Sequence, residues 1–475
     1  MCLLVALAYF VRVGANPSGF FIDEASIAYN AHAIAQTGAD EYGQTFPLYF
    51  RAFGEYKSPL YIYLLAALFR LTGPSIFVAR FLSASLGFLT VAILGLLAAR
   101  ISKQRLIGML VFLFAGLTPW LFEVSRLVFE VTLLPALLAL FLLTLYEAHK
   151  HEVWSIRYSV ALALLLGLTT YSYSGGRLLA PLFAIGLLIF VTRRRWLGVV
   201  ITCALFALTL LPLIVFNAHH PGTLGERFKY VTFVKAGDTP TRIVWRFVKN
   251  YLWDFSPRAW LFLGDPEPRH HLPGTGSLLA GVVICATIGL VCVLLYRRRE
   301  AWWRFVIYGL LVSPIPAALT LDHFHTLRLI AMPMFLIVLT VPALQFLLGN
   351  SGMHSRRMRR AILALIVMLT LAQGAWFQWR FQTSPPRVDA FDAYYPNVLD
   401  AALAQPERPI YLFDKIPAAY MYAYWYATLR GVDLHNFQRV IMQPGAGSVV
   451  ISHELPCTNC EMIFERGEFR VYRVR

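Results

Sequence analysis

The stretches FFIDEASIAYNAHAIAQT at 20–37 and KSPLYIYLLAALFRL at 57–71 place charged side chains beside strongly apolar segments. Asp23 and Glu24 follow the first hydrophobic segment, and Lys57 precedes a short apolar segment about one loop later. Charges held against a bilayer are costly, so function is the usual reason for their presence. These three charges are therefore the first candidates for a functional site.

The composition indicates an integral membrane protein. Of the 475 residues, 58% are hydrophobic and 14% are charged, whereas a soluble domain carries about 25% charged residues. The mean hydropathy is +0.59. The net charge of +16 does not indicate nucleic-acid binding, because most basic residues lie in short tracts between apolar segments, as the positive-inside rule describes. We expect the lipid bilayer as a partner and no nucleic acid.

The apolar segments predict an all-α transmembrane region of about eleven crossings. With every basic tract on the cytoplasmic side, the predicted crossings are 1–13, 77–99, 106–121, 131–146, 158–173, 178–192, 196–216, 277–296, 302–320, 328–348 and 361–379. The odd number predicts a cytoplasmic N-terminus and an outer C-terminal tail. Pro59–Leu71 is too short to span, so we interpret it as a re-entrant or interfacial helix on the outer face.

Three longer segments would then face the outer side: 14–76, 217–276 and the tail. In the first, Ile27, Ala31 and Ile34 recur at helical spacing before Gly38. This pattern predicts an amphipathic helix over Asp23–Thr37 that lies on the membrane.

The tail shows the pattern of a small α/β domain. Pro409–Phe413 is strand-like, Ala418–Leu429 is helix-like, and a terminal hairpin is expected to turn near Gly467. The predicted domains are thus a polytopic transmembrane domain over 1–380 and an extracytoplasmic α/β domain over 381–475.

Six cysteines are too few for a disulfide framework. Cys457 and Cys460 form a CxxC in the predicted outer domain. A local disulfide is favoured there over a zinc site, because no second ligand pair follows. The sequence has no P-loop and no GxGxxG, which argues against a soluble nucleotide donor.

The order of several motifs resembles a known family. The motifs are DE at 23–24, KSPLY at 57–61, SRLVFE at 125–130, TTYSYSGGRLLAP at 169–181 and DHFHTLRLIAMP at 322–333. They are similar to the lipid-carrier-dependent membrane glycosyltransferases, which include protein O-mannosyltransferases and the aminoarabinose transferases that modify lipid A. The resemblance implies the GT-C fold, a polyprenyl-phosphate sugar as donor and an inverting single displacement.

The chemistry of such a transfer suggests roles for the charged residues Asp23 and Lys57. Cleavage of the sugar–phosphate bond leaves a dianionic lipid phosphate that needs cations, and the acceptor hydroxyl needs a carboxylate to take its proton. The resemblance makes Asp23 the general base, and the alternative is a helix N-cap. It makes Lys57 a phosphate ligand, and the alternative is a snorkelling lysine. Ser58 stands where many family members have a second proline.

The resemblance adds a second catalytic acid and two cations. Glu130 begins a crossing and would orient the acceptor or the base; the alternative is an i,i+4 ion pair with Arg126. Arg177 and Arg328 occupy two outer corners, where each would either grip a phosphate or cap a helix beside lipid headgroups.

Further candidates for substrate or lipid-phosphate binding are Glu24, Tyr61, Tyr173, His323 and His325. Tyr173 would line the sugar pocket or belong to an aromatic belt. No metal ligand is assigned, because His323 and His325 at i,i+2 do not share a helix face. No cofactor is required by this reasoning, and a divalent metal ion is left open.

We therefore expect an inverting glycosyltransferase in the plasma (inner) membrane. It would move a sugar from a polyprenyl-phosphate donor to an extracytoplasmic hydroxyl or phosphate on a lipid A-type lipid, a protein or an envelope glycan. The alternative is a polyprenyl-linked glycan flippase or another transporter. Transporters typically place charges at the membrane midplane and break their helices there, whereas the charges here gather at the ends of the apolar segments.

Overall fold

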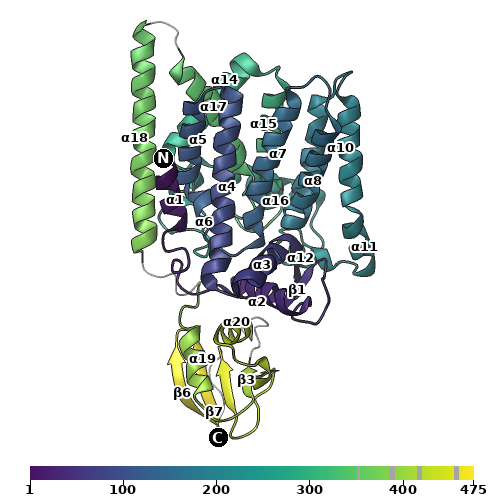
Figure 1. The fold of residues 1–475 in the computed structure, drawn as a ribbon, viewed down its shortest axis with the longest axis vertical. Helices are drawn as coiled ribbons and strands as arrows, with labels where there is room; N and C mark the ends of the chain where they lie inside the picture. The colour runs from purple at the N-terminus through teal and green to yellow at the C-terminus, as the bar shows by residue number, and fades with distance from the viewer. Residues whose placement is uncertain (350–352, 385–390, 414–419, 454–458) are drawn as a thin grey trace. The chain divides into compact units, whose positions relative to one another are not determined.

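The computed structural model describes residues 1–349, 353–384, 391–413, 420–453 and 459–475 (Figure 1). The described chain forms two compact units. Unit 1 contains 1–11, 57–60 and the described part of 83–384. Unit 2 contains 12–56, 61–82 and the described part of 385–475. The predicted division into 1–380 and 381–475 stays a prediction.

Unit 1 is built of helices, most of them apolar. Its α-helices are α1 (Cys2–Phe10), α4 (Ile76–Ser102, which begins in unit 2), α5 (Arg105–Leu117), α6 (Pro119–Val124), α7 (Leu133–His149), α8 (Ile156–Ser172), α9 (Gly176–Gly186), α10 (Trp196–Thr209), α11 (Leu211–His219), α12 (Glu226–Val231), α13 (Pro240–Asp254), α14 (Ala280–Cys292), α15 (Ala301–Val312), α16 (Ile315–Ala318), α17 (Met332–Leu348) and α18 (Met353–Thr383). Short 3₁₀ or π segments are η1 (Glu130–Thr132), η2 (Leu187–Phe190), η3 (Thr223–Gly225), η4 (Ala259–Leu263) and η5 (Val293–Arg297).

Several of these helices have the length and apolar composition of membrane-spanning helices. Within the described residues, five helical segments are long and apolar enough to cross one: Ile76–Ser102, Glu130–His149, Trp196–His219, Ala280–Arg297 and Arg356–Thr383. Shorter apolar helices overlap four more predicted crossings, at Arg105–Leu117, Ile156–Ser172, Gly176–Phe190 and Met332–Leu348. The chain is thus a multi-pass membrane protein, and the number of about eleven crossings stays a prediction.

The helices depart from the predicted crossings at several places, among them the segment predicted at 106–121, which is divided between α5 and α6. The segment predicted at 302–320 is divided between α15 and α16, because Pro314 and Pro316 cannot continue the hydrogen-bond ladder of α15. The segment predicted at 1–13 forms only α1, which has 9 residues. The division at 302–320 matters for the site, because the chain that follows α16 carries three predicted site residues, His323, His325 and Arg328.

The helices of unit 1 pack in neighbouring pairs (Figure 1). α14 packs along α17, and α8 contacts α7, α9 and α10. At Gly289 of α14, an added Cβ would lie 1.7 Å from the backbone oxygen of Leu339 in α17. Only glycine permits this approach, so the two helices pack backbone to backbone and form a rigid support for the loops of unit 1.

Unit 2 is an α/β unit, and the end of its β2 and the start of its α3 include residues 57–60 of unit 1. Its elements are α2 (Ile22–Thr37), β1 (Phe50–Ala52), β2 (Glu55–Lys57), α3 (Pro59–Thr72), α19 (Tyr395–Leu403), β3 (Ile410–Phe413), α20 (Tyr420–Arg430), η6 (Leu434–Asn436), β4 (Phe437–Val440), β5 (Val449–Ser452), β6 (Cys460–Arg466) and β7 (Phe469–Val474). β1 pairs with β2, and a second sheet has the order β4-β3-β5-β7-β6. In the second sheet β3 is parallel to β4 and β5, and β7 is antiparallel to β5 and β6.

The main elements predicted for the tail are confirmed. The strand expected at Pro409–Phe413 is β3, the helix expected at Ala418–Leu429 is α20, and the terminal hairpin is β6–β7. β4, β5 and α19 were not predicted. Cys460 is disulfide-bonded, as the CxxC suggested; its expected partner, Cys457, lies outside the described residues.

The helix predicted at Asp23–Thr37 is confirmed as α2, but two details were wrong. Phe21 is the N-cap, so Asp23 lies inside the first turn and does not cap the helix. The expected membrane-facing stripe is also covered: Ile27, Ala31 and Ile34 are at most 7% exposed. Its small residues allow α2 to pack closely against α20, so burial against protein replaces the expected burial against lipid.

Candidate functional site

The junction between β2 and α3 holds Lys57. Phe53 and Gly54 have φ angles of 53° and 82°, which form a tight turn between β1 and β2. Lys57 ends β2 and is only 6% exposed. Pro59 begins α3, where the missing backbone N–H of proline has no penalty. The hairpin and the helix therefore fix the backbone on both sides of Lys57 and Ser58.

Unit 1 brings the predicted residues Lys57 and Glu130 together. The backbone N–H of Ser58 donates to Oε2 of Glu130 at 2.5 Å, across 72 positions of sequence. Lys57, Arg177 and Arg227 all lie within electrostatic reach of the Glu130 carboxylate. Glu130 is the first residue of η1, just before α7, where the helix dipole favours a negative charge.

Arg126 and Glu130 do not have the helical arrangement that the alternative of an i,i+4 ion pair assumed. α6 ends at Val124 and η1 begins only at Glu130, so the two residues do not share a helix. The Arg126 guanidinium instead donates to the backbone oxygens of Tyr9 at 2.9 Å and Val11 at 3.2 Å. Arg126 therefore anchors the end of α1.

Three arginines and a tyrosine line one cavity of unit 1. The cavity has a volume of about 310 Å³ and is lined by Tyr173, Arg177, Arg227 and Arg328 together with apolar side chains such as Phe228. We call it the basic cavity. Arg227, Arg328 and Glu130 all lie within electrostatic reach of the Tyr173 hydroxyl. The basic cavity and the Glu130 carboxylate therefore form one electrostatic neighbourhood.

The predicted arginines of the basic cavity are held by polar contacts. One terminal nitrogen of Arg177 donates to the backbone oxygen of Leu224 at 3.2 Å. One terminal nitrogen of Arg328 donates to Oγ1 of Thr320 at 2.9 Å and to a carboxylate oxygen of Asp322 at 2.5 Å. These contacts hold both guanidinium groups at the same cavity, Arg177 from the first turn of α9 and Arg328 from the segment between α16 and α17.

Sequence reasoning missed Arg227. It lies on the short helix α12, within the polar segment that was predicted at 217–276. The sequence distances from Arg227 to Arg177 and to Arg328 follow no pattern that would predict a shared site. Its only signal in the sequence is a basic residue in a segment predicted to face the outer side, and many other arginines share that signal.

The remaining predicted residues of the first segment belong to unit 2. Asp23 is half-buried in the first turn of α2. Glu24 is fully buried and forms an ion pair with Arg80 at 2.9 Å. Glu24 also accepts the backbone N–H of Phe21 at 2.9 Å. The Tyr61 hydroxyl donates to the backbone oxygen of Ala79 at 3.2 Å. Glu24 and Tyr61 thus both make contacts that stabilise unit 2.

The two predicted histidines lie in different surroundings. His323 is near Trp253, with ring centroids 6.0 Å apart, and lines a second cavity of about 280 Å³ that also contains Lys249. His325 is buried beside His270, with ring centroids 4.8 Å apart. Neither is among the side chains that line the basic cavity.

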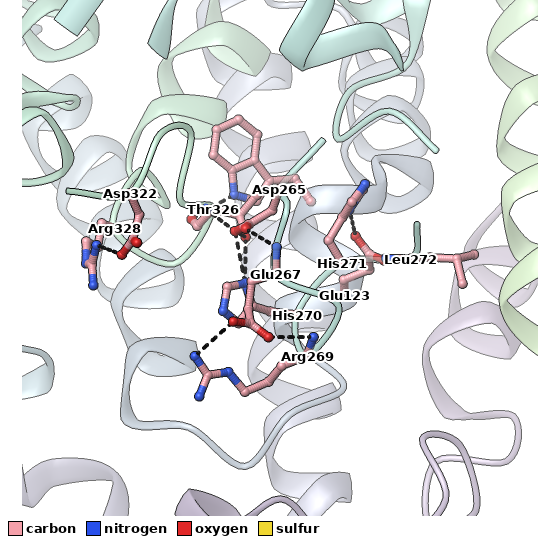
Figure 2. A network of polar contacts seen from close by, with 11 residues as sticks. Glu123, Asp265, Glu267, Arg269, His270, His271, Leu272, Asp322, Thr326 and Arg328 are labelled. Atoms are coloured by element: carbon pink, nitrogen blue, oxygen red, sulfur yellow. Dashed lines mark hydrogen bonds and ion pairs between the residues drawn. The ribbon is translucent and has the colours of Figure 1, made fainter. Parts of the chain in front are cut away.

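His325 lies beside a buried polar network that includes Asp265, His270 and Thr326, which sequence reasoning also missed (Figure 2). His270 donates to Oδ2 of Asp265 at 2.9 Å. Burial acts to raise the pKa of Asp265, but the hydrogen bond and charge of His270 hold this pKa well below its usual range. Burial lowers the pKa of His325. Among the described residues, Asp265, His270 and His325 could hold a metal ion, since each offers a ligand atom and these atoms lie within 4.8 Å of one another.

Comparisons with known proteins agree with this architecture. The sequence model of the family described as dolichyl-phosphate-mannose-protein mannosyltransferase matches residues 56–219. The structure is similar to apo ArnT from Cupriavidus metallidurans, with a TM-score of 0.62 and 13% identity over 99% of this chain and 96% of the other. It also matches ArnT from the same organism bound to undecaprenyl phosphate, with a TM-score of 0.49 and 15% identity over 99% and 97% of the two chains. No curated protein matches the sequence.

The likeness to apo ArnT shows the class of fold, which is that of ArnT, an aminoarabinose transferase. Together with the family match over 56–219, it confirms the resemblance to the lipid-carrier-dependent GT-C glycosyltransferases.

Proposed function

We propose that the protein transfers a sugar from a polyprenyl-phosphate carrier to an acceptor outside the cytoplasm. The observation that carries this proposal is the basic cavity, with Arg177, Arg227 and Arg328 in its wall. Arginine grips phosphate with two parallel donors, and three guanidinium groups match a phosphate whose charge rises during the reaction. The family match at 56–219 begins one residue before Lys57 and includes Glu130 and Arg177.

The proposed reaction is a single inverting displacement. The acceptor oxygen attacks the anomeric carbon, the bond from that carbon to the phosphate oxygen breaks, and the lipid phosphate leaves as a dianion. Lys57 and the arginines of the basic cavity stabilise that dianion. Asp23 takes the acceptor proton as general base, and Glu130 orients the reacting groups beside Lys57. Tyr173 contributes to the sugar pocket.

The proposed setting is the plasma (inner) membrane. About eleven crossings would leave the N-terminus in the cytoplasm and the domain at 381–475 outside. The segments 14–76 and 217–276 would then face the side on which a flipped lipid-linked sugar is presented. The acceptor group would be a hydroxyl or a phosphate.

The test uses purified protein in lipid nanodiscs. Radiolabelled polyprenyl-phosphate sugars are added one at a time, with wild type beside Asp23→Asn. Asp23→Asn removes the base and keeps the shape, so donor binding should remain while label release from the carrier is lost. An active Asp23→Asn enzyme would contradict the base role. Donors that are moved across the bilayer but never cleaved would contradict the transferase and favour a flippase.

A further inference from the structure

Three buried histidines of unit 1 differ in how their ring nitrogens are used. His271 has both nitrogens satisfied, since Nδ1 lies 2.8 Å from the Glu123 carboxylate and Nε2 lies 2.8 Å from the backbone oxygen of Thr275. His270 and His325 each leave one buried nitrogen, Nε2 and Nδ1 respectively, without a hydrogen-bond partner among the described residues. An unpartnered buried polar atom is costly, so these two rings require a further explanation.

The Asp265 carboxylate near these rings is held by several hydrogen bonds. Oδ2 accepts the backbone N–H of Thr326 at 2.6 Å and its hydroxyl at 2.7 Å, and Oδ1 accepts the backbone N–H of Glu267 at 2.9 Å. Figure 2 shows Asp265 and His270, which belong to one loop, and Thr326, which belongs to another, pointing toward one another. Asp265, His270 and His325 are 4%, 1% and 7% exposed. The carboxylate thus has the supporting hydrogen bonds that metal ligands typically have.

We propose that Asp265, His270 and His325 bind a divalent transition-metal ion, with Zn²⁺ as the best match. Two imidazole nitrogens and a carboxylate oxygen form a ligand set that suits zinc and does not suit Mg²⁺ or Ca²⁺, which prefer oxygen ligands. The ligand atoms lie within 4.8 Å of one another. Tetrahedral zinc sets them about 3.3 Å apart, so binding draws the group inward by up to about 1.5 Å.

The metal ion joins two loops and thereby fixes a corner of the basic cavity. Asp265 and His270 lie between η4 and α14, whereas His325 lies between α16 and α17. The backbone oxygen of His325 accepts the N–H groups of Arg328 and Leu329, both at 3.0 Å. His325 therefore begins the turn that carries Arg328, and Arg328 lines the basic cavity. The ion is a structural clamp that positions this arginine.

The test measures metal directly and does not depend on transfer activity. Wild-type protein in detergent is incubated with ZnCl₂, desalted into metal-free buffer and analysed by mass spectrometry for bound zinc. We expect about one zinc per chain in the wild type and a loss of at least about tenfold in Asp265→Asn and in His325→Ala. His219→Ala is the matched control, because His219 is exposed and lies on α11; it should keep the wild-type content.

X-ray absorption at the zinc edge gives a second measurement on the unaltered protein. The expected first shell contains nitrogen and oxygen at about 2.0–2.1 Å with scattering from two imidazole rings. Because it uses wild type, this result stands even where a variant fails to fold. Wild type that holds no zinc after reconstitution would overturn the proposal. Wild-type zinc content in folded Asp265→Asn and His325→Ala would also overturn it.

Discussion

The substitution Arg227→Gln tests the residue that the structure adds to the site. Arg227 lines the basic cavity and lies within electrostatic reach of both Glu130 and Tyr173. Glutamine keeps much of the length and polarity of arginine but removes the charge. If Arg227 holds the donor phosphate, the change removes a charge-assisted hydrogen bond worth about 1.5–3 kcal/mol. That loss corresponds to about a 10- to 150-fold decrease in kcat/KM for the donor.

The position of the other arginines supports this magnitude. Asp322 lies 2.5 Å from Arg328 and offsets part of its charge, so the field in the basic cavity depends strongly on Arg177 and Arg227. Arg227→Lys should recover part of the activity, because lysine restores the charge but not the planar pair of donors. This graded order, with wild type above lysine above glutamine, is specific to a phosphate contact.

The assay follows release of label from a radiolabelled polyprenyl-phosphate sugar in nanodiscs, with thermal unfolding measured on each variant. Arg242→Gln is the control, because Arg242 lies in the same polar segment but its side chain is 61% exposed and pairs with Asp238. We expect this control to stay within about twofold of wild type. If folded Arg227→Gln also stays within about twofold, the assignment of the basic cavity as the phosphate site is refuted.

Three further predictions concern other charges. Lys57→Ala should weaken donor binding and slow bond cleavage by at least about tenfold; unchanged donor affinity and rate would make Lys57 a packing or snorkelling residue. Glu24→Gln leaves the Arg80 charge uncompensated in a fully buried site, so the free energy of unfolding in urea should fall by about 3–5 kcal/mol, and a loss under about 1 kcal/mol would contradict a structural role. Burial raises the pKa of Glu41 from 4.5 to about 7. The protonated Glu41 carboxyl therefore favours the folded state fully below pH 4.5, and this contribution to the free energy of unfolding is lost as the pH rises through about 7. Between pH 4 and pH 8 the free energy of unfolding, measured by thermal unfolding, should decrease more in wild type than in Glu41→Gln, by up to about 3 kcal/mol. Parallel pH dependences of the two proteins would contradict this.

The helices of unit 1 could be predicted because their signal is local. A long apolar run bounded by basic residues identifies a crossing wherever its neighbours lie. The division between α15 and α16 was visible in Pro314 and Pro316, but apolar composition outweighed it in the prediction. β4 and β5 were not predicted, and their pairing with β3 depends on tertiary contacts that runs of four residues do not encode.

The site could be predicted only where chemistry and a motif coincide. Lys57, Glu130, Arg177 and Arg328 were identified by charge and by resemblance, and the structure brings all four into one region of unit 1. Asp265 and His270 could not be found this way, because their link to His325 joins separate loops. The i,i+2 spacing of His323 and His325 argued against a metal site built from these two residues on one helix face. This spacing could not indicate that His325 lies beside His270, which belongs to another loop.

The departure at Ser58 shows why a motif alone does not define the site. A proline at this position, as in many relatives by resemblance, has no backbone N–H. Ser58 keeps its N–H and donates it to Glu130 at 2.5 Å. The carboxylate is therefore oriented by the main chain of the same dipeptide that carries Lys57. A second proline could not make this contact, so the serine adds a link between the backbone of the predicted phosphate ligand and the predicted acid that the motif alone does not contain.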